Sequence, residues 1–223
     1  MLLVLWDIDG TLVDSAGHGR HAFEDAYRAV VGRPFAGEVA MAGHTDHQIA
    51  MAMLGEEHGR LPRMLAELAE GLAARKDRIR AEGHPYPGAR EALEALARRD
   101  DLIQSVLTGN LEANAAVKLS AFGLDAFLDF EAGGYGSDPH AARSDLVGVA
   151  RERARAKHGQ PTATVLIGDT PLDVSAAHTA DARAVAVATG PYGVDELRDS
   201  GADEVLEDLR ETAAVVAAVT GDR

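Results

Sequence analysis

Four short, mostly apolar runs are spaced along the chain, and each is followed by small or polar residues. They cover residues 2–6, 102–107, 164–167 and 184–188. Runs of this length and composition are typical of strands that are buried on both faces of a parallel sheet. A stretch compatible with a helix follows each run, so the pattern predicts repeated strand–helix units.

Apolar residues recur every three to four positions in the segments between the runs, with charged residues at the other positions. The clearest segments are residues 90–99, 111–122 and 142–157. Amphipathic helices of this kind can cover both faces of a sheet. We therefore expect an α/β fold with a Rossmann-like parallel sheet as its core, and a ligand site beyond the carboxyl ends of the strands.

The alternation is interrupted between about residues 15 and 84, where only helical patterns occur. These patterns cover residues 20–31, 46–54 and 61–79. The segment 13–15 would leave the core, and the stiff, turn-forming sequence Pro-Tyr-Pro-Gly at 85–88 would return to it. The predicted organisation is an α/β catalytic core, residues 1–14 and 85–223, with an all-helical domain inserted at residues 15–84.

Composition narrows the range of functions. The 223 residues include no cysteine, which excludes disulfides, thiolate metal ligands and a cysteine nucleophile. A net charge of −14 argues against a nucleic-acid partner, because binding to a phosphate backbone requires clustered cations. No run is long enough to span a membrane, and the first run is too short for a signal-peptide core. We therefore expect a cytoplasmic protein with no membrane partner.

Asp7 and Asp9 follow the first run two residues apart, so an extended backbone would project both carboxylates to the same side. A divalent cation would relieve their mutual repulsion. A carboxylate from another strand end, Asp169 or Asp173, would complete the oxygen-rich site that Mg²⁺ prefers. The alternative, that the first two acids only cap a turn, is disfavoured because three other runs also end in polar residues.

The polar strand ends form recognisable motifs. They read Asp-Ile-Asp-Gly-Thr at 7–11, Thr-Gly-Asn at 108–110 and Gly-Asp-Thr-Pro-Leu-Asp at 168–173. This combination resembles the haloacid dehalogenase superfamily over nearly the whole chain, and the helical insert resembles the cap domain of phosphoglycolate-phosphatase-like members. The resemblance implies a Mg²⁺-dependent phosphatase that hydrolyses a small phosphorylated metabolite through a phosphoaspartate.

By this resemblance, Asp7 is the nucleophile, and Asp9 protonates the leaving oxygen and then activates water. Asp7, the backbone carbonyl of Asp9, and Asp169 would be metal ligands, while Asp173 would position a metal-bound water or the basic residue. The Thr108 hydroxyl would bind the phosphoryl group, although it could also cap the following helix. Backbone amides of the first two motifs would cradle the phosphate oxygens. The substrate-binding residues expected in these motifs are Gly10, Thr11, Gly109 and Asn110.

The third motif of the family departs from its common pattern, because no Lys-Pro pair follows Phe130. Arg143, at the predicted start of a helix, is the expected cation beside Asp7 and the phosphate. One alternative is a surface Arg143 that pairs with a local acid such as Asp138. The other gives this role to Lys118, which lies within an earlier predicted helix and is expected to reach solvent.

Within the helical insert, the loop at residues 43–46 enters a predicted helix, and either of its last two residues is a candidate N-cap. His44 in this loop is expected to face the core and contact the substrate. Arg20, together with His18 and His21, forms a second candidate group for substrate binding.

The predicted function is therefore a phosphatase, with a sugar phosphomutase of the same superfamily and a non-catalytic binding module as alternatives. A dehalogenase is disfavoured, because Asp9 and Asp169 argue for phosphate chemistry. A monomer and a homodimer are both compatible with the sequence.

Overall fold

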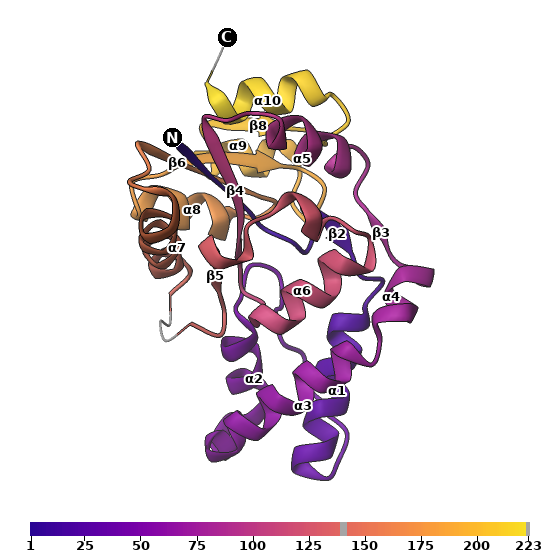
Figure 1. Cartoon of the computed structure of the whole chain (residues 1–223). Helices are drawn as coiled ribbons and strands as arrows, with labels where there is room; N and C mark the ends of the chain where they lie inside the picture. Colours follow the sequence, from indigo (N-terminus) through magenta and orange to yellow (C-terminus); the bar gives the residue numbers. More distant parts are fainter. Residues whose placement is uncertain (139–141, 222–223) are drawn as a thin grey trace.

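The computed structural model describes residues 1–138 and 142–221, which fold around a six-stranded parallel sheet (Figure 1). The strand order is β5-β4-β1-β6-β7-β8. The strands are β1 (Leu2–Trp6), β4 (Leu102–Thr108), β5 (Gly134–Tyr135), β6 (Ala163–Gly168), β7 (Arg183–Val187) and β8 (Glu204–Leu206). Because β1 lies between β4 and β6, the loops that follow these three strands meet at one edge of the sheet.

Side chains of β1 alternate between two hydrophobic clusters, one on each face of the sheet. Val4 and Trp6 belong to one cluster, and Leu3 and Leu5 belong to the other. The helices of the first cluster are α5 (Ala89–Ala97), α6 (Glu112–Ala121) and α10 (Thr212–Thr220). Those of the second are α7 (Arg143–His158), α8 (Pro171–Thr179) and α9 (Val194–Asp199). The predicted α/β fold, with helices on both faces of a parallel sheet, is therefore confirmed.

Residues 15–84, here called the helical segment, lie below the sheet in Figure 1. The strands β2 (Val13–Asp14) and β3 (His84–Pro85) pair antiparallel, so the chain leaves and re-enters the α/β region at one place. The helices are α1 (His18–Val31), α2 (Asp46–Leu54), α3 (Leu61–Ala73) and α4 (Lys76–Glu82). They share a third hydrophobic cluster. Three 3₁₀ turns complete the described elements, namely η1 (Gly55–Arg60), η2 (Asp125–Phe127) and η3 (Phe130–Ala132).

One predicted helix is divided in two. The sequence predicts a helix over residues 61–79, whereas α3 ends at Ala73 and α4 begins at Lys76. Leu72 and Ile79, on either side of the break, are both buried in the same cluster and lie seven residues apart. Since the apolar spacing continues across the break, hydrophobic periodicity could not reveal it. No helix in the described part of the chain is long and apolar enough to cross a membrane.

Candidate active site

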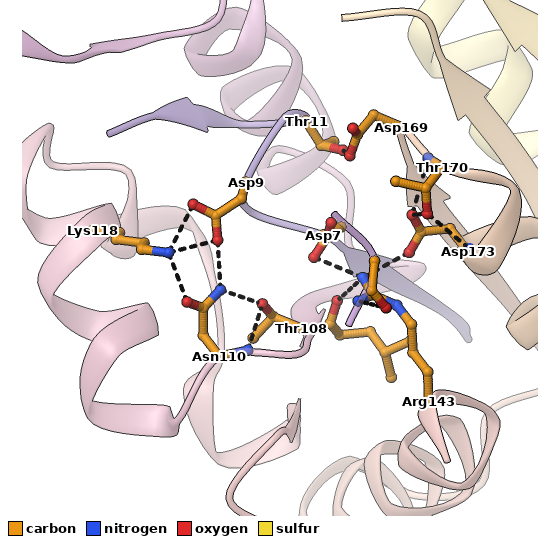
Figure 2. Close-up of polar contacts among 12 residues, drawn as sticks. Asp7, Asp9, Thr11, Thr108, Asn110, Lys118, Arg143, Asp169, Thr170 and Asp173 are labelled. Carbon is orange, nitrogen blue, oxygen red and sulfur yellow. Dashed lines mark hydrogen bonds and ion pairs between the residues drawn. The ribbon is translucent and has the colours of Figure 1, made fainter. Parts of the chain in front are cut away.

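Three acidic side chains meet beyond the carboxyl ends of β1 and β6 (Figure 2). Asp7 directly follows β1, Asp169 directly follows β6, and Asp173 lies in the first turn of α8. All three are buried, and one carboxylate oxygen of each lies within 4.8 Å of the others. The register explains the meeting, because Trp6 and Ile167 are paired on the two adjacent parallel strands.

The start of α8 fixes the position of Asp173. Thr170 is the N-cap residue, and its side-chain oxygen accepts a hydrogen bond from the Asp173 amide at 3.3 Å. In return, Oδ2 of Asp173 accepts one from the Thr170 amide at 3.1 Å. This reciprocal capping box satisfies two amides at the helix end. The other oxygen, Oδ1, lies 2.7 Å from Nη2 of Arg143, so Asp173 also orients that guanidinium.

Arg143 begins α7 and reaches into the acidic cluster. Its Nη2 lies 2.7 Å from Oδ1 of Asp7 and 2.7 Å from Oδ1 of Asp173, and its side chain is only 8% exposed. Burial opposes the charge, but the carboxylates of Asp173 and Asp7 outweigh it and raise the pKa of Arg143. Asp138 pairs instead with Arg153 at 2.7 Å, so the alternative of a surface Arg143 bound to Asp138 is wrong.

The acidic cluster places three carboxyl groups beside one guanidinium. Burial raises the pKa of Asp7 to about 7, against the opposing effect of Arg143. Burial, with the nearby charges of Asp7 and Asp173, raises the pKa of Asp169 to about 8. Buried carboxylate oxygens with this preference for protons suit a hard divalent cation, which would take the place of the protons. Asp7, Asp169 and Asp173 are therefore the candidate metal ligands.

Gly10 allows the two acidic loops to pack closely. Its φ is +84°, and a Cβ at this position would lie 2.3 Å from Oδ2 of Asp169. The Thr11 hydroxyl donates to Oδ1 of Asp169 at 3.1 Å and so joins the same loops. The amides of Gly10 and Thr11 donate to the carbonyls of Val13 and Ile8, at 3.3 and 3.4 Å. These two amides, expected to bind phosphate, thus have partners within the turn.

Asp9 lies in a second group of contacts, apart from the other three acids (Figure 2). Lys118 places Nζ 2.7 and 2.6 Å from the two carboxylate oxygens of Asp9, and 2.7 Å from Oδ1 of Asn110. The side-chain nitrogen Nδ2 of Asn110 donates to Oδ2 of Asp9 and to Oγ1 of Thr108, both at 2.7 Å. Lys118 is only 4% exposed, so the prediction that it reaches solvent is wrong.

The sequence carries a signal for Lys118 that hydrophobic periodicity does not use. Asn110 lies two residues before α6 (Glu112–Ala121), and Asn114 and Lys118 follow it at intervals of four residues within the helix. Residues with this spacing lie on one helical face, below the polar end of the preceding strand. All three line the same cavity. A search for polar residues at helical spacing from Asn110 would have identified Lys118.

Asp46 joins the helical segment to the start of α6. Its Oδ2 accepts hydrogen bonds from the Leu111 amide at 2.8 Å and from Nδ2 of Asn114 at 2.9 Å. The Asp46 amide donates to the carbonyl of Gly109 at 2.7 Å. Burial raises the pKa of Asp46, although the nearby charge of Lys118 acts in the opposite direction. The carboxylate thus supplies the acceptor that the N-terminus of α6 needs.

The structure decides between the candidate capping residues. Thr45 caps α2, since its hydroxyl accepts from the Gln48 amide at 3.1 Å and its own amide donates to Oε1 of Gln48 at 3.0 Å. Leu111 is the N-cap residue of α6 and makes no side-chain cap. Thr108 therefore caps no helix, and the alternative role considered for it is wrong.

A cavity of about 430 Å³ lies between the α/β region and the helical segment. On the α/β side it is lined by Asp7, Asp9, Thr108, Lys118, Arg143 and Asp169. Arg20 and His44 line it from the helical segment, and both side chains are exposed. Neither His18 nor His21 is among the described residues that line it. The structure thus separates Arg20 from the two histidines grouped with it on sequence grounds.

A family model described as haloacid dehalogenase-like hydrolase matches residues 4–178, which is more than half of the chain. The chain belongs to this family. A second model, described as HAD-hydrolase-like, matches residues 145–212. The resemblance inferred from the sequence motifs is therefore confirmed.

Curated relatives cover most of this haloacid dehalogenase-like hydrolase. A protein named phosphoglycolate phosphatase from Nitrosococcus oceani is 28% identical over 223 residues, which cover 94% of this chain and 93% of the relative. A protein of the same name from Mesorhizobium japonicum is 27% identical over 202 residues, or 84% of this chain and 83% of the relative. A solved hydrolase structure from Pseudomonas syringae has the same fold, with a TM-score of 0.72 and 23% identity over 98% of this chain and 99% of that one.

Proposed function

We propose that this haloacid dehalogenase-like hydrolase is a Mg²⁺-dependent phosphatase that acts on a small phosphorylated metabolite through a phosphoaspartate at Asp7. The observation that carries the proposal is the meeting of Asp7, Asp169 and Asp173 with Arg143 at the α/β side of the cavity. The relatives named phosphoglycolate phosphatase support the same reaction class.

Mg²⁺ would be held by Asp7, Asp169 and the backbone carbonyl of Asp9. The buried oxygen donors, with pKa values raised at Asp7 and Asp169, suit a hard cation that replaces protons. When bound, Mg²⁺ would neutralise part of the negative charge that otherwise repels a carboxylate from a phosphate. The contact between Asp173 and Arg143 supports a positioning role for Asp173 rather than direct ligation.

The reaction has two steps. First, a carboxylate oxygen of Asp7 attacks phosphorus, the bond to the leaving oxygen breaks, and Asp9 gives that oxygen a proton. Then Asp9 accepts a proton from water, which attacks the phosphorus of the phosphoaspartate, releases inorganic phosphate and restores Asp7. Lys118 and Asn110 hold the Asp9 carboxylate in place between the steps, and Arg143 offsets the charge on the transferring group.

Thr108 is arranged to donate to the phosphate. Its Oγ1 accepts hydrogen bonds from both the amide and the side-chain nitrogen of Asn110, at 3.2 and 2.7 Å. With these acceptor positions filled, the hydroxyl hydrogen is available to a phosphate oxygen in the cavity. The amides of Ile8, Asp9 and Gly109 would complete the set of phosphate donors.

We assign residues 15–84 as a cap domain over an α/β core formed by residues 1–14 and 85–223. The paired strands β2 and β3 would be its hinge. The loop of this domain at residues 43–46 lies against the core, because a Cβ at Gly109 would be 2.3 Å from the carbonyl oxygen of His44. Closure of such a cap excludes water and would bring His44 to the leaving group.

Release of inorganic phosphate from a generic aryl phosphate, with Mg²⁺ or with a chelator, tests the function. The proposal predicts hydrolysis that requires the metal. A binding module would give no phosphate under either condition, and a dehalogenase would show no metal requirement. A phosphomutase would transfer the phosphoryl group to an added sugar phosphate in preference to water. Any of these three results would contradict the proposal.

A further inference from the structure

Two exposed polar side chains line the cavity from the helical segment. Arg20 belongs to α1, and His44 lies in the loop before α2. Four apolar side chains on the same wall are no more than 4% exposed and are held in the hydrophobic cluster of the segment, namely Phe23, Ile49, Leu68 and Leu72. A substrate that reaches this wall therefore has a guanidinium and an imidazole available for contact, whereas the buried apolar groups offer it little surface.

Arg20 is a cation that no acid of the cavity neutralises. No ion pair or side-chain hydrogen bond of Arg20 occurs in the described part of the chain. The nearby acids are engaged with other cations, because Asp7 pairs with Arg143 and Asp9 pairs with Lys118. A guanidinium presents a planar fork of donors that matches a carboxylate. Arg20 is thus available to bind an anionic group of the substrate other than the transferred phosphate.

The first turn of α1 lies on the side of the cavity where the alcohol portion leaves. A Cβ at Gly19, next to Arg20, would be only 3.7 Å from Nζ of Lys118. Lys118 in turn holds Asp9, the proposed donor of a proton to the leaving oxygen. The N-cap residue Gly17 makes no side-chain cap, and the first turn contains no acid, so the positive end of the helix dipole is uncompensated. An anionic group on the alcohol portion would therefore be favoured beside Arg20.

His44 offers an acceptor rather than a second positive charge. Its Nδ1 lies 3.0 Å from the carbonyl oxygen of Ala42. Because a carbonyl oxygen can only accept, Nδ1 carries the hydrogen, and Nε2 of the neutral ring keeps a lone pair. The lone pair repels an anion but accepts a hydrogen bond from a hydroxyl group. The two exposed side chains thus differ in the groups that they bind.

The cavity has room for both groups. Its volume of about 430 Å³ lies in the range of sites that enclose whole organic ligands, roughly 300–1,000 Å³. 2-Phosphoglycolate has a carboxylate but no free hydroxyl, so it would leave Nε2 of His44 without a partner. A second phosphate in place of the carboxylate would carry a charge of about −1.5 to −2, which the single guanidinium of Arg20 does not neutralise.

From these observations we infer that the substrate is a phosphomonoester whose alcohol portion carries one carboxylate, bound by Arg20, and one free hydroxyl, which donates to Nε2 of His44. This inference rests on the proposed phosphatase function and specifies its substrate class. It distinguishes this chain from an enzyme that is selective for the two-carbon ester 2-phosphoglycolate.

Four three-carbon esters test the inference on the wild-type enzyme with Mg²⁺. Propyl phosphate has neither group, 3-phosphonooxypropanoate has only the carboxylate, propane-1,2-diol 1-phosphate has only the hydroxyl, and 3-phosphoglycerate has both. We expect the carboxylate to raise kcat/KM by about tenfold or more, and the hydroxyl to raise it by about two- to tenfold. 3-Phosphoglycerate should therefore be the best of the four and should also exceed 2-phosphoglycolate.

Several results would overturn the inference while leaving the phosphatase function intact. They are a kcat/KM that does not depend on the carboxylate, one that does not depend on the hydroxyl, and a preference for 2-phosphoglycolate or for propane-1,3-diol bisphosphate over 3-phosphoglycerate. Hydrolysis of an aryl phosphate but of none of these esters has the same meaning. Failure to hydrolyse the aryl phosphate as well would instead overturn the proposed function together with the inference.

Matched variants assign each group to its side chain. Arg20→Met should lower the ratio of kcat/KM for 3-phosphonooxypropanoate to that for propyl phosphate by about tenfold. Arg28→Met is the control, since Arg28 is exposed on the same helix, pairs with Asp25 and is not among the described cavity residues. His44→Phe should lower the ratio for propane-1,2-diol 1-phosphate to propyl phosphate by about two- to tenfold, whereas His47→Phe, at an exposed position outside the described cavity residues, should not. A variant whose ratio equals that of its control would contradict the assignment of that side chain.

Discussion

The two walls of the cavity differ in how they use their side chains. On the α/β wall, the charged groups Asp7, Asp9, Lys118 and Arg143 are fixed by ion pairs and hydrogen bonds to one another and to neighbouring residues. On the helical wall, apolar side chains are held in a packed cluster, and Arg20 and His44 are exposed beside them. Under the proposed function, reaction and selection are carried by separate parts of the chain. Changes to the first wall should affect all substrates, whereas changes to the second should redistribute activity among them.

The largest effect is expected from Asp7→Asn. The amide is a poor nucleophile, so kcat should fall by more than about 10³-fold for every ester while the fold is retained. Steady-state phosphate release, with circular dichroism as the check on folding, measures this. Asp195→Asn is a suitable control, because Asp195 is 93% exposed and lies outside the cavity. Near-normal turnover by the Asp7→Asn enzyme would show that the nucleophile does not lie on the α/β wall.

Lys118→Met should have the next largest effect. The substitution keeps the aliphatic stem but leaves the Asp9 carboxylate without its cation, so kcat should fall by about 10²-fold for all esters alike. Lys157→Met is the matched control, since Lys157 pairs with Asp129 and Glu131 outside the cavity. If Lys118→Met changed only the ranking of esters, Lys118 would belong functionally to the opposite wall.

The acids at the strand ends could be predicted from the sequence, because each lies next to the apolar run that forms its strand. Asp7 and Asp169 each adjoin a continuous apolar run, and parallel pairing then brings the two acids together. The Lys118–Asp9 contact could not be predicted in this way, because it joins residues 109 positions apart. The same holds for Asp46, which meets Leu111 across 65 positions. Such contacts depend on how α6 and the helical segment pack, which local periodicity does not encode.

The pH dependence of Mg²⁺ binding should report the acidic cluster. The pKa values of Asp7 and Asp169 are raised to about 7 and about 8, so the metal-free protein holds protons that Mg²⁺ must displace. The Kd for Mg²⁺ should therefore fall by up to about a hundredfold per pH unit below pH 7, where two protons are displaced, by up to about tenfold between pH 7 and 8, and level off above pH 8. Calorimetric titration in buffers of different ionisation enthalpy would measure both the affinity and the released protons.

Without Mg²⁺, the stability of the folded protein should decrease as pH rises, whereas the affinity for Mg²⁺ increases. The folded state keeps protons on Asp7 and Asp169 that the unfolded chain loses above its ordinary carboxyl pKa of 3.8. The free energy of unfolding should thus fall as pH rises from about 4 to about 8. Added Mg²⁺ should raise Tm most at the upper end of this range. A Kd independent of pH, with no such change in Tm, would exclude these acids as the metal site.

The smallest effect is expected where the two walls are joined. Asp46→Ala removes the acceptor for the Leu111 amide and the Asn114 side chain, which should cost about 1–3 kcal/mol of the contact between the helical segment and α6. KM should rise by about tenfold with a smaller change in kcat, and the helical segment should be cleaved faster by protease. Asp77→Ala, at an exposed position of α4, is the control. Unchanged KM and protease resistance would show that Asp46 does not hold the two walls together.

The central claim, that phosphoryl transfer takes place on the α/β wall through Asp7, is tested most directly by trapping the intermediate. The enzyme is quenched in acid during turnover with Mg²⁺ and a phosphomonoester, reduced with borohydride, and analysed by peptide mass spectrometry. Reduction converts a phosphoaspartate to homoserine, so the account predicts homoserine in place of Asp7, and none in the Asp7→Asn enzyme or without substrate. Homoserine in place of Asp9 or Asp169, or active turnover with no modified acid, would contradict it.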